Sequence, residues 1–143
     1  MISAATLRGY AATTYGIGGR GGTAIGLRLG AACPDADALL RRLGAASLTC
    51  LNAWNPLSRP RPVTRNMAAH LRLQRDLAAR GLRALPHTGV PDSPHWAPEP
   101  GFAVLDLDEE KAIALAERYG QFGIVQYRRG GVADLLLTRH ARR

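Results

Sequence analysis

Short apolar segments of strand length alternate with helical patterns along this 143-residue chain, and glycines and prolines separate them. Strand-like patterns occupy residues 10–15, 23–29, 46–53, 82–86, 101–107, 122–127 and 133–138. Amphipathic patterns predict helices at 34–43, 64–80 and 108–119, with Thr64 and Asp108 as N-caps of the last two. In the second helix, the apolar stripe expected to face inward consists of Met67, Leu71, Leu77 and Ala78. The predicted order is ββαβαββαββ. This order indicates an α+β fold with a single mixed or antiparallel sheet and about three helices.

The length fits a single domain spanning residues 1–143, and no repeat or linker divides the chain. No apolar run approaches the roughly 18 to 20 residues that a membrane span needs. The first ten residues lack the basic start and apolar core of a secretory signal. We therefore expect a soluble, cytoplasmic protein without a membrane partner, of unspecified oligomeric state.

The net charge of +8 is unevenly distributed. Residues 1–75 contain ten arginines against two aspartates, whereas residues 76–143 contain nine basic and nine acidic side chains. A basic excess favours anionic partners such as nucleotides, nucleic acid or phosphorylated metabolites. The alternative is that these arginines are solvated and reflect composition alone.

Several common functional motifs are missing. Gly16, Gly18 and Gly21 match G-x-G-x-x-G, but a strand pattern follows them where a dinucleotide site needs a helix, so they predict a hairpin tip. Neither a phosphate-binding P-loop nor a G-x-S-x-G nucleophile turn is present. Cys33, Cys50 and the histidines lack metal-ligand spacing. The sequence therefore predicts neither a metal nor a cofactor. It also predicts that both thiols are reduced, with a disulfide between Cys33 and Cys50 as the alternative.

The loop after the central strand carries the most distinctive local chemistry. Asn55-Pro56 makes a stiff turn between Trp54 and Ser58, because proline fixes φ and asparagine tolerates unusual backbone angles. Arg65 and Asn66 then lie at a helix start, where free N–H groups and the helix dipole favour an anion. The alternative is an ordinary strand–helix connection with Trp54 packed over the core.

Nearly the whole chain, most clearly residues 51–127 and more loosely the N-terminal hairpin, resembles a small bacterial family known only as domain of unknown function 3293. The likeness rests on an Ala-Trp-Asn-Pro-x-Ser turn, a Trp-x-x-Glu segment before a strand, and a Gly-Gln turn after the third helix. His70 departs from the pattern, because such proteins often carry an asparagine there. The matching positions in this chain are Trp54, Asn55, Pro56, Ser58, Asn66, Gly89, Trp96, Glu99, Phe102, Gly120 and Gln121.

Polar residues at the ends of separate elements predict one amide-rich cluster with a single carboxylate. Glu99 is the candidate general base, or it balances Arg65. His87 and His95 flank a proline-rich loop and are interpreted as surface histidines that could supply acid–base chemistry. The predicted ligand-binding residues are Trp54, Asn55, Ser58, Arg65, Asn66, Glu99 and Gln121.

These features favour a binding domain, catalytic or not, for a small anionic or nucleotide-like molecule at residues 54–66. One alternative is a nucleic-acid-binding module that uses the basic N-terminal half and stacks bases on Tyr10, Tyr15 and Trp54. Another is a protein-interaction subunit with an apolar patch around Trp54 and Trp96.

Overall fold

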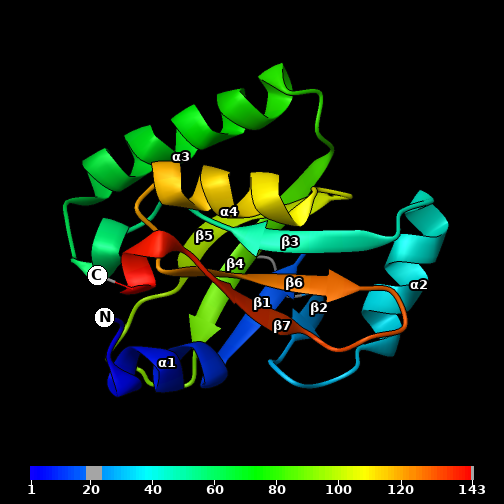
Figure 1. Ribbon diagram of the computed structural model, residues 1–143, viewed down its shortest axis with the longest axis horizontal. Coiled ribbons are helices and arrows are strands. Elements are labelled where there is room, and N and C mark those ends of the chain that lie inside the picture. Colours follow the sequence, from blue (N-terminus) through cyan, green and yellow to red (C-terminus); the bar gives the residue numbers. More distant parts are fainter. Residues whose placement is uncertain (19–23, 143) are drawn as a thin grey trace.

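Seven strands form one antiparallel sheet in the computed structural model, which describes residues 1–18 and 24–142 (Figure 1). The strand order across the sheet is β2-β1-β4-β5-β3-β6-β7. The strands are β1 (Thr13–Ile17), β2 (Ile25–Leu27), β3 (Ser47–Leu51), β4 (Ala84–Pro91), β5 (Glu99–Leu105), β6 (Gly123–Arg128) and β7 (Asp134–Leu137). The predicted α+β class is confirmed, and the order ββαβαββαββ is found after one additional N-terminal helix.

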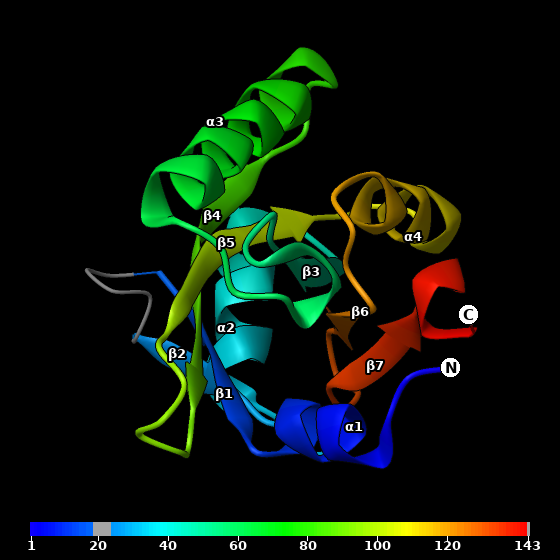
Figure 2. The ribbon, with the colours of Figure 1, turned by 90° about the vertical axis from the view of Figure 1, so that its left-hand side faces the viewer.

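The sheet curls until its two outer strands approach each other. Leu29, just beyond β2, forms a parallel bridge with Ala133, just before β7. Gly30 N donates to Ala133 O over 2.8 Å, and Ala133 N donates to Ala31 O over 3.1 Å. The curl therefore has a concave inner face and a convex outer face, as the view along it shows (Figure 2).

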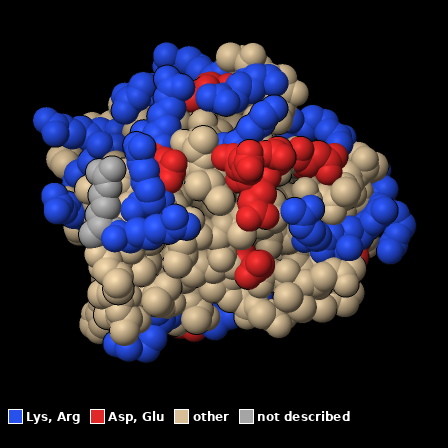
Figure 3. Space-filling view, in the orientation of Figure 1, with Lys and Arg blue, Asp and Glu red and all other residues tan. Residues whose placement is uncertain are grey.

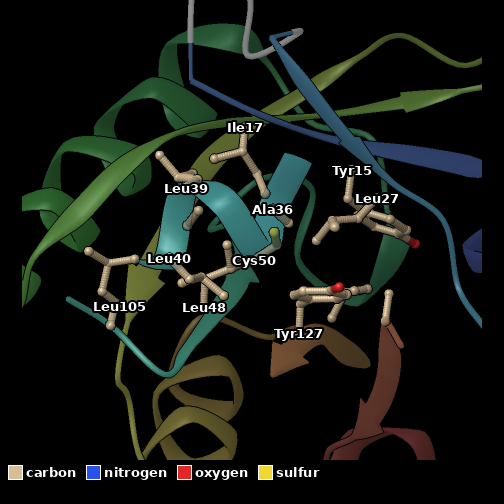
Figure 4. Packing of buried hydrophobic residues seen from close by; sticks show 14 residues of the cluster. Tyr15, Ile17, Leu27, Ala36, Leu39, Leu40, Leu48, Cys50, Leu105 and Tyr127 are labelled. Atoms are coloured by element: carbon tan, nitrogen blue, oxygen red, sulfur yellow. The ribbon is translucent and has the colours of Figure 1, made fainter. Parts of the chain in front are cut away.

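Helices cover both faces. Inside the curl lies α2 (Pro34–Leu43), whose Ala36, Leu39 and Leu40 pack against Leu48 and Cys50 of β3 and other buried side chains of the inner core (Figure 4). The outer face is covered by α3 (Val63–Ala79) and α4 (Glu109–Arg118), which form a second core with β3, β5 and β6. Asp108 caps α4 as predicted, because its carboxylate accepts from Lys111 N.

The fourth helix, α1 (Ala4–Ala11), was not predicted, and its last two residues, Tyr10 and Ala11, were assigned to a strand. Ser3 caps it by accepting from Thr6 N over 3.1 Å, and none of its residues is buried. Sequence reasoning missed it because alanine, threonine and glycine give it no apolar stripe. The predicted strand at 10–15 begins only at Thr13, and Tyr10 belongs to the helix.

Three other local predictions are wrong. Residues 87–91 continue β4 instead of forming an irregular loop, and Pro62 instead of Thr64 occupies the N-cap position of α3. Met67 and Leu71, expected to face inward, are 42% and 40% exposed. Asn66 faces inward instead, with Ala69, Leu73 and Leu77. The helix α3 is thus rotated about its axis relative to the predicted orientation, because the buried Asn66 amide requires hydrogen bonds.

The first two strands form the hairpin predicted for the glycine-rich segment. Gly16 and Ile17 of β1 pair with Gly26 and Ile25 of β2 in antiparallel register, whereas Gly21 lies outside the described residues. A strand follows the glycines, so the geometry of a dinucleotide-binding turn is absent from the described part of this segment. Over the same described residues, no helix is long and apolar enough to cross a membrane.

Candidate functional site

The turn between β3 and α3 has unusual backbone angles. Asn55, Leu57 and Ser58 have φ values of 44°, 57° and 55°, all in the left-handed region. Asparagine tolerates this region, but for other non-glycine residues it costs roughly 1–2 kcal/mol each. A short 3₁₀ helix, η2 (Pro56–Ser58), occupies the turn. Strain of this kind persists only where the surroundings hold the backbone in place, and it clusters at functional sites.

A reciprocal pair of amides holds the turn against α3. Asn55 N donates to Asn66 Oδ1 over 2.9 Å, and Asn66 Nδ2 donates to Asn55 Oδ1 over 2.8 Å. Asn66 is only 1% exposed, so these bonds form away from water, where they are hardest to replace. The side chain of Asn66, on α3, thus holds Asn55 in position.

Arg61 closes the same network. Its backbone N donates to Asn55 Oδ1 over 3.2 Å, and its Nε donates to Asn66 Oδ1 over 2.8 Å. Asn66 Nδ2 also donates to Arg61 O over 3.3 Å. The side-chain amides of Asn55 and Asn66 therefore join the two ends of the segment from Asn55 to Arg61.

The Gly-Gln turn after α4 supports the strained turn from the other side. Leu57 N donates to Gly120 O over 2.7 Å, and Gln121 Nε2 donates to the backbone oxygens of Trp54 and Tyr119 over 3.2 and 3.1 Å. Gly120 has φ of +70°, and a Cβ atom there would lie 2.8 Å from Pro56 Cβ. Only glycine satisfies both the angle and the close approach.

Glu99, the first residue of β5, faces this assembly from a distant part of the sequence. Asn55 Nδ2 and Trp96 Nε1 both donate to Glu99 Oε2, over 3.0 and 3.2 Å. Burial raises the pKa of the Glu99 carboxyl, and these two hydrogen bonds offset the increase only in part. Because both donors use Oε2, the other oxygen is the acceptor available to a ligand.

A cavity of about 420 Å³ brings four of the predicted residues together. Asn55, Ser58, Glu99 and Gln121 all line it. The other three predicted residues do not line it: Asn66 is buried behind Asn55, Arg65 is exposed on the first turn of α3, and Trp54 packs edge-on against His70 at 6.3 Å.

Much of the cavity comes from residues that sequence reasoning did not select. One wall is α1, which contributes Thr6, Gly9 and Tyr10. Burial raises the pKa of Tyr10 to about 12, so its hydroxyl keeps its proton at neutral pH. Strands and loops of the sheet contribute further lining residues, which include Tyr15, Cys50, Leu51, Asn52, His87, Trp96, Ile124 and Val125. Cap signals at Ser3 could have revealed α1, but no local signal placed it beside Glu99.

His87 is a buried cavity residue, and its interpretation as a surface histidine is wrong. It is 3% exposed, its ring stacks on Tyr15 at 6.1 Å, and burial lowers its pKa to about 4. Nδ1 lies 2.9 Å from the carbonyl oxygen of Gly16, which can only accept. At neutral pH the ring is therefore uncharged with its proton on Nδ1, and Nε2 is an acceptor.

Cys50 is not an activated nucleophile. Burial raises the pKa of its thiol to about 12, so the thiolate is essentially absent at neutral pH. Both cysteines are free, so the disulfide that the sequence left open is not formed.

The charge of the cavity differs from that of the whole protein. Its lining includes the carboxyl of Glu99 but no lysine or arginine among the described residues. The expected pairing of Glu99 with Arg65 is wrong, because Asn55 and Trp96 occupy the bonded oxygen and Arg65 is exposed. Within the ranges 1–18 and 24–142, no group of three or more His, Cys, Asp or Glu side chains could hold a metal ion.

The comparisons with known proteins identify one sequence family for the chain. The family model described as "Protein of unknown function (DUF3293)" matches residues 51–124. The chain belongs to the DUF3293 family. The matched segment of this DUF3293 protein runs from the end of β3 into β6 and so contains the strained turn, Glu99 and Gln121. No curated protein and no solved structure matches the chain.

Proposed function

We propose that this domain binds a small molecule rich in hydrogen-bond donors, uncharged or positively charged, in the cavity between α1, the strained turn and Glu99. The observation that carries the proposal is the cavity of about 420 Å³, whose lining, over the residues that the structure describes, contains one half-buried carboxylate and no lysine or arginine. Its volume lies within the roughly 300–1,000 Å³ of small-molecule sites.

Glu99, His87 and Gln121 each offer an acceptor in the lining. Glu99 has Oε1 outside its bonds to Asn55 and Trp96, and His87 offers Nε2. Gln121 directs Nε2 at two backbone carbonyls, which leaves its side-chain oxygen as the remaining acceptor. Amines, amidines and amino-substituted heterocycles complement such a set, because their N–H groups can satisfy acceptors that are poorly hydrated.

A large part of the remaining lining is apolar and favours a flat or hydrophobic ligand body. Tyr15, Leu51, Ile124 and Val125 contribute it. Burial of such a body releases roughly 25 cal/mol per Å² of apolar surface. A nucleobase or an aromatic amidine combines the two requirements, a planar apolar body with N–H groups along one edge.

The anionic ligand expected from the sequence has no support in this cavity. Phosphate groups are normally held by arginine, lysine or helix N-termini, and the lining includes neither a basic side chain nor the first turn of α3. The ionised carboxylate of Glu99 would repel such a group. A nucleotide-like ligand would enter with its base and keep its phosphate outside.

The distribution of charge also argues against a nucleic-acid module. Lysines and arginines lie along the edge over α3 and over α2, and acidic side chains over α4 separate them (Figure 3). The stripe of continuous positive potential that tracks a nucleic-acid backbone is therefore interrupted on this face.

The two tryptophans proposed for a protein-interaction patch have separate contacts, Trp54 with His70 and Trp96 with Glu99.

Glu99 is the residue that we expect to carry any acid–base chemistry on the bound molecule. A carboxyl with a raised pKa, within reach of a ligand in a cavity, can exchange a proton closer to neutral pH than an exposed one.

A thermal-shift comparison of benzamidine, adenine, benzoate and adenosine monophosphate tests the ligand class. Benzamidine and benzoate have the same shape and opposite charge, so the proposal predicts stabilisation by benzamidine and none by benzoate. Gly9→Trp should abolish the shift, because a Cβ atom added at Gly9 meets nothing within 4 Å and Gly9 lines the cavity, so the indole can occupy it. Ala11→Trp, on the same helix and outside the lining, is the control. Stabilisation by benzoate alone would refute the proposal.

A further inference from the structure

A second cavity, of about 380 Å³, lies behind the strained turn. It is bordered by the N-terminal half of α3, the C-terminal end of α4, and η3 (Arg139–Arg142), which lie together near the C-terminus (Figure 1). Its ionisable lining consists of Arg61, Arg72, Arg118, His140, Tyr119 and Glu117. We infer that this cavity binds a small molecule carrying phosphate or clustered carboxylate groups.

The positive charge of this cavity is available to a ligand. Arg72 forms no hydrogen bond or ion pair with any residue that the structure describes. Arg118 forms an ion pair with Asp76 at 3.7 Å, but its side chain is 66% exposed, so its guanidinium is still accessible to a ligand. Arg61 uses Nε for Asn66, so its two terminal nitrogens remain. Three guanidinium groups around one space suit oxyanions, which they bind through pairs of parallel hydrogen bonds.

The one acidic side chain of the lining is already engaged. Glu117 Oε2 accepts from Arg139 N over 2.7 Å, and His140 Nε2 lies 2.9 Å from the Glu117 carbonyl oxygen. That hydrogen bond leaves the negative charge of Glu117 in place, and the three guanidinium groups of the lining outnumber this carboxylate. The two cavities differ in the sign of their charge. Over the described residues, the first is lined by a carboxylate and by no lysine or arginine, and the second is lined by three arginines.

One strained turn separates the two cavities. Asn55 and Ser58 line the first, whereas Pro56 and Leu57 line the second. Arg61 connects them chemically, because its Nε and backbone N hold the amide oxygens of Asn66 and Asn55. An anion bound to the Arg61 guanidinium therefore restrains the network that positions Asn55, which provides a physical route for coupling between the cavities.

Titration with pyrophosphate and with citrate tests the second cavity independently of the first. We expect saturable binding of at least one of the two probes at low ionic strength that weakens with added salt, since Arg72 and Arg118 are exposed. The pair also separates phosphate-type from carboxylate-type recognition. Arg72→Ala combined with Arg118→Ala should weaken binding at least tenfold, and the side-chain amide resonances of Asn66 should shift on binding to the wild-type protein.

The matched control is Arg42→Ala combined with Arg75→Ala, which removes the same charge from outside the cavity and should change affinity less than twofold. A comparable loss in both double variants would show that the anion responds to net charge alone and would overturn the inference. Absence of saturable binding of both probes to the wild-type protein at low salt would also overturn it.

Discussion

Asn55 donates its Nδ2 hydrogen to Glu99 Oε2 over 3.0 Å, although 44 residues separate the two in the chain. The bond joins a left-handed turn after β3 to the first residue of β5. It also sets Glu99 in the cavity wall beside Gln121, which reaches the same turn from the end of α4.

Replacement of Asn55 tests the role of this turn in stability. Asn55→Ala removes three side-chain hydrogen bonds, to Glu99, Asn66 and Arg61, and leaves the buried Nδ2 of Asn66 with only its 3.3 Å bond to Arg61 O. We expect a loss of about 2–4 kcal/mol in the free energy of unfolding, measured by urea denaturation. Asn55→Gly should be less destabilising than Asn55→Ala, by about 0.5–1 kcal/mol, because φ is 44°. An equal or larger loss for glycine would contradict the proposed backbone strain.

Glu99→Gln should stabilise the protein at neutral pH. Burial raises the pKa of Glu99 above its ordinary 4.5, so the folded state binds its proton more tightly than the unfolded state. Stability from this group is present below pH 4.5 and is lost as the pH rises through the raised value. Glutamine carries no charge and can still accept from Asn55 and Trp96, so its unfolding midpoint at pH 7 should be higher. A lower midpoint for Glu99→Gln at pH 7 than for the wild-type protein would be inconsistent with this assignment.

His87 should make stability fall in mild acid. Its pKa is lowered from 6.5 to about 4, so the unfolded state binds a proton that the folded state does not. The stability present above pH 6.5 is therefore lost between pH 6.5 and pH 4, with a total of about 3 kcal/mol. An NMR titration of the His87 ring should show the uncharged imidazole still dominant at pH 5.5. A ring already half protonated at that pH would contradict its burial.

The convergence of polar residues could be predicted from the sequence, because Asn55, Ser58, Glu99 and Gln121 all stand where a strand or helix begins or ends. Short connections between packed elements bring such ends together. The rotation of α3 could not be predicted. An apolar pattern favoured Met67 and Leu71 on the buried side, but the buried amide of Asn66 determined the orientation through partners distant in sequence.

The remaining cavity residues depend on tertiary structure alone. Tyrosine is common in strands, so the sequence assigned Tyr10 to one. Only the packing of α1 across the curled sheet places it beside Glu99. His87 follows a proline and precedes a proline-rich segment, which indicates an exposed loop. Pairing of β4 with both β1 and β5 buries it instead.

Two glycines provide a matched pair of opposite predictions. Gly120→Ala forces a methyl group against Pro56 at a φ of +70°, so we expect a loss of about 2 kcal/mol or more. Gly9→Ala lies inside α1 with nothing within 4 Å of the new methyl, so we expect a gain of about 0.5–1 kcal/mol. Thermal unfolding of both variants checks the pair. A stable Gly120→Ala protein would show that the turn can move away from the Gly-Gln segment.

The two tryptophan indole N–H resonances provide the most direct test of the cavity. Trp96 Nε1 donates to Glu99 Oε2, whereas Trp54 lies outside the lining and packs on His70. In a ¹⁵N NMR titration with benzamidine, the proposed site predicts a saturable shift of the Trp96 indole, an unmoved Trp54 indole, and loss of the shift in Glu99→Gln. Benzoate at the same concentrations should move neither resonance. A Trp96 shift that is equal for benzamidine and benzoate, or unchanged in Glu99→Gln, would contradict a donor-binding site built on Glu99.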